Sequence, residues 1–392
     1  MSVPNQASAS ASSTPHGWQG RFPENEIISL LSVNRPFNLA ESTSQDLHVG
    51  ELLDLVGLDA VRDVRLGYGS ADGLPLLRER IGEVCGVPTE RVVTTTGTAL
   101  ALYLLAIELC RPGDEVVLFT PCFPPSRDAL VGAGIDVRDL PLRFEDGFQV
   151  DLEHFADMLT PRTRLVSLAT PQNPSGVATS PETVDAMLSI MQQHAPETTL
   201  FVDETYRFAT YGDAQPPLSF ADRDPRIVSA ASVSKAFGAP GLRVGWITTA
   251  DPGLRERLMT AKMNIVISGS PLDETLAAHL LDKREAVLAP RRAMLSEALR
   301  TVEDWRETEA ARLEWVRPDG GALCCMRLRP DAFDDAAVVR FWDAHERLDV
   351  QLASGAWFGE RERTFRLGFG YLPLDTLPRA LAAVSKAMDA AA

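Results

Sequence analysis

Hydrophobic positions follow two different patterns along the chain, and the first covers residues 75–250. There, short apolar runs alternate with longer segments whose apolar positions repeat at the period of a helix. The runs predict strands, at residues 91–96, 115–120, 164–169, 199–202, 226–230 and 242–247. Helices are predicted between some of them, at 99–109 and 181–195. This alternation predicts an α/β fold with a mostly parallel sheet, covered on both faces, that binds ligands at the carboxyl ends of its strands.

The second pattern begins after about residue 270, where strands and helices no longer alternate. It predicts one long or broken helix at residues 273–305 and two further helices at 334–347 and 374–391. It also predicts two strands, at 321–328 and 364–369. Such a mixture predicts a smaller α+β domain. We therefore expect four parts. They are a disordered tail at residues 1–17, a segment at 18–47 that joins the small domain, a large domain at 48–280 and a small C-terminal domain at 281–392.

Composition and charge narrow the classes of partner. A chain of 392 residues that is 45% hydrophobic can bury a large core, and its net charge of −16 argues against nucleic acid and anionic membranes as partners. The N-terminus has no basic start and no apolar run, and no window is long and apolar enough to span a membrane, so we expect a cytoplasmic protein. Five scattered cysteines predict neither a disulfide framework nor a metal site.

The first candidate for chemistry is a lysine among small and hydroxyl residues. Lys235 lies close to Ser232 and Ser234, and Arg243 follows eight positions later. A lysine amine can form a Schiff base with an aldehyde cofactor, while hydroxyls and a guanidinium can hold a phosphate. The alternative is an exposed lysine in a glycine-rich turn. Residues 232–245 resemble the lysine motif of fold-type I pyridoxal-phosphate enzymes, the aminotransferase class I/II family.

This resemblance implies the fold and a cofactor. The fold is a large domain with a mostly parallel seven-stranded sheet and a smaller α+β domain, and the cofactor is pyridoxal 5′-phosphate. The turn between the strand at 91–96 and the next helix is where the family holds the cofactor phosphate, on Gly97, Thr98 and Ala99. Free backbone N–H groups at a helix N-terminus attract phosphate. A common Thr/Gly helix cap is the alternative.

The resemblance also assigns groups around the cofactor ring. Asn173, in a turn-forming Asn-Pro sequence, matches the amide that meets the ring hydroxyl and contributes to substrate binding. Asp203 matches the carboxylate that keeps the pyridine nitrogen protonated, so that the ring withdraws electrons. Tyr206 matches the phenol that donates to the ring oxygen. Phe123 occupies the place of a stacking aromatic, where a tyrosine or tryptophan is usual.

Three further residues relate to the substrate and to a second subunit. Arg366 matches the arginine that binds the substrate α-carboxylate bidentately. Glu41 is a candidate partner for a cationic substrate side chain, or a solvated loop residue. Tyr68 matches the tyrosine that reaches the cofactor phosphate of the neighbouring subunit, which implies a homodimer with shared active sites.

The reaction itself stays open at this level. The resemblance implies an enzyme that transforms an L-α-amino acid through an external aldimine and a quinonoid, with transamination as the default. The segments around residues 37–52 and 232–243 also resemble a cyclase of this family that expels a β-hydroxyl, so a lyase, cyclase or decarboxylating enzyme of specialised metabolism is the alternative. A non-catalytic regulator on this fold is a third reading, which residues 1–17 disfavour because they are too short and not basic for a DNA-binding segment.

Overall fold

The computed structural model describes residues 20–31 and 35–392, so the tail predicted at 1–17 lies outside the described residues. Its largest sheet has seven strands in the order β2-β8-β7-β6-β5-β3-β4. Their bounds are Val92–Thr95 (β2), Glu115–Thr120 (β3), Asp136–Pro141 (β4), Thr163–Ala169 (β5), Thr199–Asp203 (β6), Ile227–Ser232 (β7) and Gly245–Thr249 (β8). Only β8 runs antiparallel to its neighbours within this sheet, β2 and β7. The predicted, mostly parallel seven-stranded sheet is thus confirmed.

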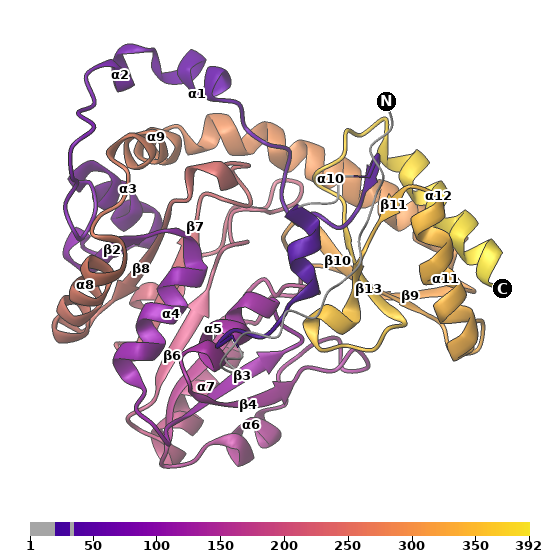
Figure 1. Cartoon of the computed structure of the whole chain (residues 1–392), viewed down its shortest axis with the longest axis horizontal. Helices are drawn as coiled ribbons and strands as arrows, with labels where there is room; N and C mark the ends of the chain where they lie inside the picture. The colour runs from indigo at the N-terminus through magenta and orange to yellow at the C-terminus, as the bar shows by residue number, and fades with distance from the viewer. Residues whose placement is uncertain (1–19, 32–34) are drawn as a thin grey trace, which may run out of the picture.

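Both faces of this sheet are buried, because successive side chains of its strands point to opposite sides. In β3, Val116 and Leu118 pack into one apolar cluster, while Val117 and Phe119 pack into another. Helices cover the two faces, as Figure 1 shows: Gly97–Leu109 (α4) and Pro252–Val266 (α8) on the first, Leu152–Met158 (α6) and Pro181–His194 (α7) on the second. The near-continuous apolar runs of the sequence follow from this double burial.

The strand predicted at 242–247 begins later than expected. Residues Pro240–Leu242 form a short 3-10 turn, and Arg243 follows in the left-handed region with φ 51°. The chain becomes extended only at Gly245. The Arg243 side chain then reaches the start of α4, because a Cβ atom at Gly97 would lie 2.7 Å from Arg243 Nη2.

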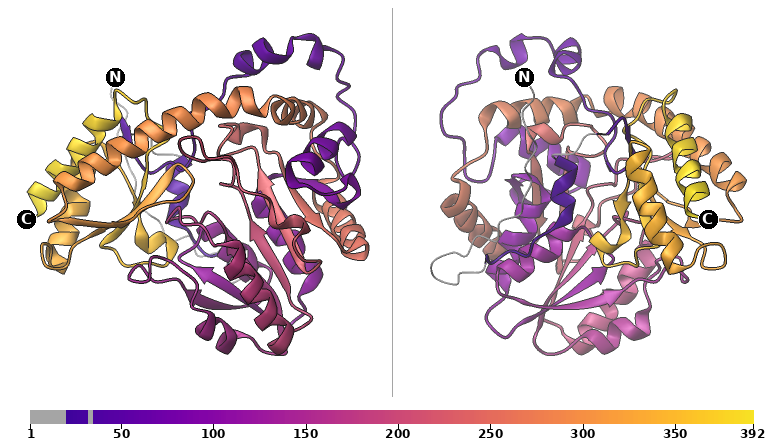
Figure 2. Two further views of the ribbon diagram at one scale, coloured as in Figure 1. Left: turned by 180° about the vertical axis from the view of Figure 1, so that it is seen from behind. Right: turned by 45° about the vertical axis from the view of Figure 1, so that its right-hand side comes forward.

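The C-terminal part is a second layered unit, coloured orange to yellow in Figure 2. An antiparallel sheet in the order β12-β13-β10-β9 is formed by Ala353–Ser354, Thr364–Gly368, Leu323–Leu328 and Leu313–Val316. Helices Arg284–Thr308 (α10), Asp335–Arg347 (α11) and Leu377–Ala391 (α12) pack with it. Near the N-terminus, Phe37–Asn38 (β1) pairs in parallel with Val350–Gln351 (β11), so the chain before the large sheet joins this unit.

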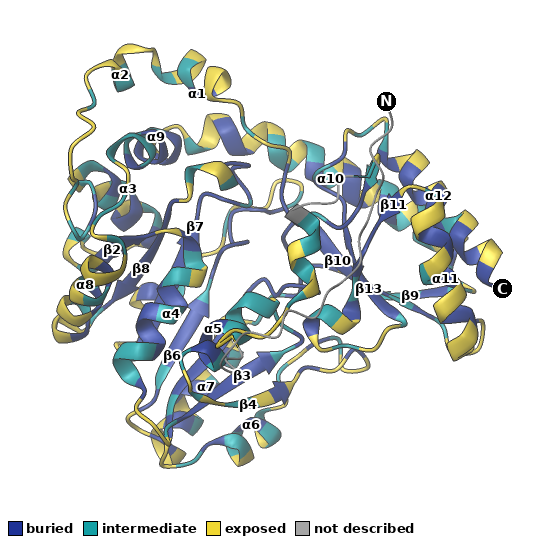
Figure 3. Ribbon diagram, viewed as in Figure 1, coloured by how far each residue is buried: buried dark blue, intermediate teal, exposed yellow. Residues whose placement is uncertain are grey.

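The helix predicted at 273–305 as long or broken is broken, at Lys283, into Pro271–Asp282 (α9) and α10. Other elements differ from the sequence prediction. The pattern gave no sign of β1, β4, β9, β11, β12, α6 or α8, nor of Val49–Val56 (α1), Asp59–Arg62 (α2), Pro75–Cys85 (α3) and Pro124–Gly132 (α5). Most of these strands are short or partly exposed, as Figure 3 shows for β4 and β9, so they lack a continuous apolar run.

The break at Lys283 lies beside the boundary that we propose between a large part at 48–280 and a small part at 281–392. Helix α10 lies within the small part and contacts both α12 and α9, most of which belongs to the large part. Among the helices of the described residues, none is long and apolar enough to cross a membrane.

Candidate active site

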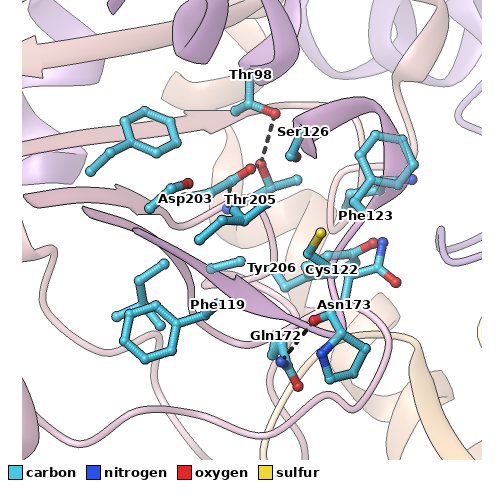
Figure 4. A pocket seen from close by; sticks show the side chains of 17 residues that line it. Thr98, Phe119, Cys122, Phe123, Ser126, Gln172, Asn173, Asp203, Thr205 and Tyr206 are labelled. Carbon is cyan, nitrogen blue, oxygen red and sulfur yellow. Dashed lines mark hydrogen bonds between the residues drawn. The ribbon is translucent and has the colours of Figure 1, made fainter. Parts of the chain in front are cut away.

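A pocket opens at the carboxyl end of the large sheet (Figure 4). Six of the predicted site residues line it: Thr98, Phe123, Asn173, Asp203, Tyr206 and Lys235. They come from α4, the end of β6 and the loops that follow β3, β5, β6 and β7, which parallel strand order brings to one edge. A second, adjoining cavity shares Phe123 and Lys235 with the first and adds Glu41 and Arg366.

Lys235 lies where the two cavities meet. Its Nζ atom donates a hydrogen bond to Ser42 Oγ at 3.1 Å, and Ser42 Oγ also accepts from the Tyr206 hydroxyl at 3.0 Å. Burial lowers the pKa of Lys235 to about 8, although the charge of the Glu41 carboxylate acts in the opposite direction and raises it. Burial likewise raises the pKa of Tyr206 to about 12, so this phenol stays a proton donor at neutral pH. A lysine with this pKa has a substantial share of neutral, nucleophilic amine near pH 8.

Asp203 stands at the end of β6 and is held by a threonine two residues later. The backbone N–H and the hydroxyl of Thr205 donate to Asp203 Oδ1 at 2.9 and 2.5 Å, and Thr205 Oγ1 lies 3.3 Å from Thr98 Oγ1. Burial raises the pKa of Asp203, while these hydrogen bonds oppose the rise. The carboxyl group is thus oriented and lies in an apolar wall beside Phe201 and Ala169, where a cationic ring nitrogen would be a favourable partner.

Arg366 is an arginine at the centre of β13 with only 2% of its surface exposed. Its Nη1 donates to Asn173 Oδ1 at 2.9 Å and its Nη2 to the Ala40 carbonyl at 2.5 Å, while its guanidinium lies 4.8 Å from the centre of the Phe358 ring. Its Nε finds no hydrogen-bond partner within the described residues. A buried cation with an unused donor, at the wall of a cavity, fits a carboxylate ligand.

Groups that can bind a phosphate form a cradle between α4 and the turn after β7. Helix α4 begins at Gly97, whose φ of 78° suits glycine, and among the described residues no side chain caps its N-terminus. A Cβ atom at Gly97 would lie 2.7 Å from Arg243 Nη2, so the glycine lets the guanidinium approach the helix end. Ser232 and Ser234 are buried beside it, and the Ser234 N–H donates to Ser232 Oγ at 3.3 Å. Free N–H groups, an arginine and serines fit a phosphate dianion.

The remaining predicted residues are placed differently. Ala99 faces a separate cavity with Phe22 and Tyr103, outside the pocket that holds Lys235. Glu41 is partly buried at the wall of the second cavity. Tyr68 is 88% exposed and lines neither of these two cavities of its own chain.

Sequence reasoning missed the groups that hold the predicted residues in place. Ser42 contacts both Lys235 and Tyr206, and Thr205 orients Asp203. Residues 23–28 form a wall of the second cavity, where Asn25 donates to Asp128 and Glu26 accepts from Trp357. The hydroxyl of Thr205, two residues after an aspartate, is a recognisable turn signal, whereas nothing in the local sequence marks Ser42 or residues 23–28.

Comparison with known proteins agrees with this geometry. The sequence model of the family "Aminotransferase class I and II" matches residues 44–384. The chain is 33% identical to capreomycidine synthase of Streptomyces vinaceus, over 76% of this chain and 75% of that protein. It is 29% identical to arginine–pyruvate transaminase of Pseudomonas aeruginosa, over 86% and 84% of the two chains. The crystal structure of the PLP-dependent cyclase OrfR superposes with a TM-score of 0.85 at 24% identity, over 97% and 99% of the chains.

The chain therefore belongs to the aminotransferase class I and II family, and the resemblance seen in its motifs is confirmed. It has the fold of the pyridoxal-phosphate enzymes, is an enzyme of that family, and uses pyridoxal 5′-phosphate as its cofactor. The uncapped helix α4, the cradle at Gly97 and the buried Arg366 all fit this cofactor and a carboxylate substrate.

Proposed function

We propose that the chain transforms an L-α-amino acid with a cationic side chain, by transamination. The observation that carries the proposal is the shared position of Lys235, which lies on the wall of both cavities, between Asp203 on one side and Arg366 on the other. When bound, the cofactor supplies a ring that withdraws electrons from the substrate α-carbon. The roles below assign each residue a place around that ring.

The proposed roles follow from the contacts. Lys235 binds the cofactor covalently through Nζ and then moves the proton of the substrate α-carbon as general base. Asp203 keeps the ring nitrogen protonated, and Tyr206 donates to the ring oxygen. Arg366 and Asn173, already joined by a hydrogen bond, bind the substrate α-carboxylate.

The phosphate is held by a second group of residues. In our proposal the N-terminus of α4, with Gly97, Thr98 and Ala99, donates backbone N–H groups, and Ser232, Ser234 and Arg243 add hydroxyls and charge. Phe123, at the start of α5 and 36% exposed, stacks on the ring.

Three carboxylates support a cationic substrate side chain. Glu24, Glu26 and Glu41 line the second cavity, which also contains Arg366 and Lys235. An α-amino acid whose carboxylate binds Arg366 extends its side chain into this cavity. The relative named arginine–pyruvate transaminase agrees with such a substrate.

The second candidate is a cyclase or lyase that expels a β-substituent. It is favoured by the 33% identity with capreomycidine synthase. The residues proposed above serve both reactions, because each begins with removal of the α-proton by Lys235.

A panel of amino acids tests both candidates. Purified enzyme is incubated with L-arginine, L-lysine and a β-hydroxylated arginine, with and without pyruvate, and the products are identified by mass. L-citrulline and L-norleucine, neutral analogues of similar shape, are the controls. Turnover of the cationic amino acids that requires pyruvate supports transamination, whereas loss of water without a keto acid supports the cyclase. Equal turnover of the neutral analogues contradicts a cationic substrate.

The assignment of Lys235 has its own test. The holoenzyme is expected to be yellow, and borohydride is expected to bleach it while fixing the cofactor to Lys235, as peptide mass mapping would show. Lys235→Ala loses this reducible adduct and several orders of magnitude of activity, because the nucleophile and the base are the same amine. A Lys235→Ala protein that still forms the adduct would contradict the assignment.

We also propose a homodimer with shared active sites. Tyr68 is exposed in a single chain and lies beside the end of α8, since the Gly69 N–H donates to Ser268 Oγ at 3.2 Å. Large apolar side chains are exposed on α1, on α8 and in the segments that follow these helices: Val49, Leu55, Leu58, Leu66, Met263, Ile265 and Ile267. Exposed apolar surface of this kind is typical of a subunit interface.

A further inference from the structure

Ser42 is buried between the two residues that are expected to meet the reacting atoms. Only 3% of its surface is exposed, and its Oγ lies 3.1 Å from Lys235 Nζ and 3.0 Å from the Tyr206 hydroxyl. Within the described part of the chain, this is the only hydrogen bond of Lys235 Nζ. Ser42 also lines the second cavity, next to Glu41. Its hydroxyl is therefore the direct polar neighbour of the amine on the side where the substrate enters.

The segment that carries Ser42 is held by two hydrogen bonds within itself and by two that join it to the site. Asn38 Oδ1 accepts from the N–H groups of Ala40 and Glu41 at 3.1 and 3.2 Å. The carbonyl of Ala40 accepts from Arg366 Nη2, and the N–H of Ser44 donates to the carbonyl of Lys235 at 3.3 Å. A loop bonded to both the arginine and the lysine places the hydroxyl of Ser42 with little freedom.

We propose that Ser42 is a positioning residue for Lys235: its hydroxyl holds Nζ at the boundary of the two cavities and links it to the Tyr206 phenol. The Tyr206 oxygen lies 3.0 Å from Ser42 Oγ, so the three groups form one chain of hydrogen bonds. When the phenol donates to the ring oxygen, the Ser42 hydroxyl can donate to the phenol oxygen and keep this chain. Misplacement of a reacting amine by about 1 Å is enough to slow a reaction by a factor on the order of 100. Ser42 therefore acts on rate through the lysine, and the inference rests on the proposed role of Lys235.

The groups around Lys235 Nζ predict the direction in which loss of the Ser42 hydroxyl shifts the pKa of this nitrogen. The groups that face it are Glu41 from the N-terminal segment, Asp203 from β6, Arg366 from β13 and Arg243 from the turn before β8. Ser42 adds an acceptor for the protonated nitrogen, which favours the charged form. Loss of this acceptor is expected to lower the pH at which the nitrogen loses its proton.

The test is a pH titration of the holoenzyme, followed through the absorption of the bound cofactor. Ser42→Ala is expected to move the midpoint down by at least about 0.5 pH unit and to lower kcat about tenfold or more, with KM changed less than about threefold. Ser42→Thr keeps the hydroxyl and is expected to titrate closer to the wild type than Ser42→Ala does. Ser44→Ala is the matched control, because Ser44 is fully buried two residues away and its hydroxyl has no partner within the described residues.

Each result bears on the inference. A midpoint in Ser42→Ala that equals the wild-type value, or an equal shift in Ser44→Ala, overturns it, as does a Ser42→Thr protein that departs further from the wild type than Ser42→Ala. Failure of the underlying function looks different, since Lys235 would then carry no reducible adduct in the wild type. The adduct is therefore mapped in the same preparation, so that the two failures are separated.

Discussion

At the scale of single residues, burial determines which charges the site can use. Lys235, Asp203 and Arg366 lie in one apolar environment, and burial shifts the pKa of each of them toward the neutral form. Each also has a hydrogen-bond partner that orients it: Ser42 for Lys235, Thr205 for Asp203, and Asn173 for Arg366. The site thus holds its groups in place before a ligand arrives.

The pKa of Lys235 gives a pH dependence for cofactor capture. Because burial lowers it from 10.5 to about 8, the neutral amine increases about tenfold per pH unit below 8 and levels off above about 9. We expect the rate at which apoprotein forms the yellow adduct to follow the same curve in stopped-flow absorbance. A rate that keeps rising beyond pH 10, as for an exposed lysine, contradicts the shift.

Arg366→Lys is expected to weaken the substrate far more than the cofactor. A lysine cannot reproduce a bidentate contact with a carboxylate, so the variant should lose roughly 1.5–3 kcal/mol of transition-state binding, which lowers kcat/KM about 10- to 150-fold. Steady-state kinetics and a cofactor titration measure the two effects. Arg329→Lys, at an arginine that pairs with Asp331 on the surface, is the control. Equal losses of substrate and cofactor affinity would assign Arg366 a structural role.

At the scale of elements, the N-terminus of α4 allows a sharp test of the proposed phosphate site. We expect Gly97→Ala to lower cofactor affinity at least about tenfold, because the new Cβ would displace Arg243 from the helix end. Gly113→Ala is a matched control, since Gly113 also has a positive φ, 92°, but nothing lies within 4 Å of the added Cβ. Both variants should lose similar stability in thermal melts, and cofactor titration separates them. Equal cofactor affinity in the two variants contradicts the cradle.

The sequence predicts elements well where one physical signal dominates. The buried strands around β3 and β6 are continuous apolar runs, and Gly97, Asp203 and Lys235 lie in local motifs at their ends. The short strand β1 pairs with β11 more than 300 residues later, so its pairing has no local signal. Ser42 illustrates the same limit, because its neighbours Lys235 and Tyr206 are distant in the chain. Tertiary packing, and not propensity, determines these positions.

At the scale of the whole molecule, the C-terminal unit and the N-terminal segment complete the site of the large sheet together. Asn25 donates to Asp128 on α5, and Glu26 accepts from Trp357 near β12, so residues at the wall of the second cavity contact both the large sheet's helices and the C-terminal unit. The proposed substrate cavity is therefore built from three parts of the chain.

The proposed dimer predicts complementation between inactive chains. If Tyr68 reaches the cofactor of the partner subunit, a mixture of Tyr68→Ala and Lys235→Ala chains contains hybrids in which one site has both wild-type residues. Activity is therefore expected to reappear after subunit exchange, which mass spectrometry of differently tagged chains verifies. Each parent must be nearly inactive alone. Verified hybrids without activity would place Tyr68 outside the neighbouring site.

The bond between Arg366 and the carbonyl of Ala40 joins residues 326 positions apart. During synthesis on the ribosome, the lysine, the aspartate and the helix end that holds phosphate emerge well before strand β13. A nascent chain, or one truncated ahead of β13, can therefore present the groups for cofactor while it has no arginine for a carboxylate. If Arg366 binds the substrate as proposed, competence for the substrate therefore arises after competence for the cofactor, once β13 has been made.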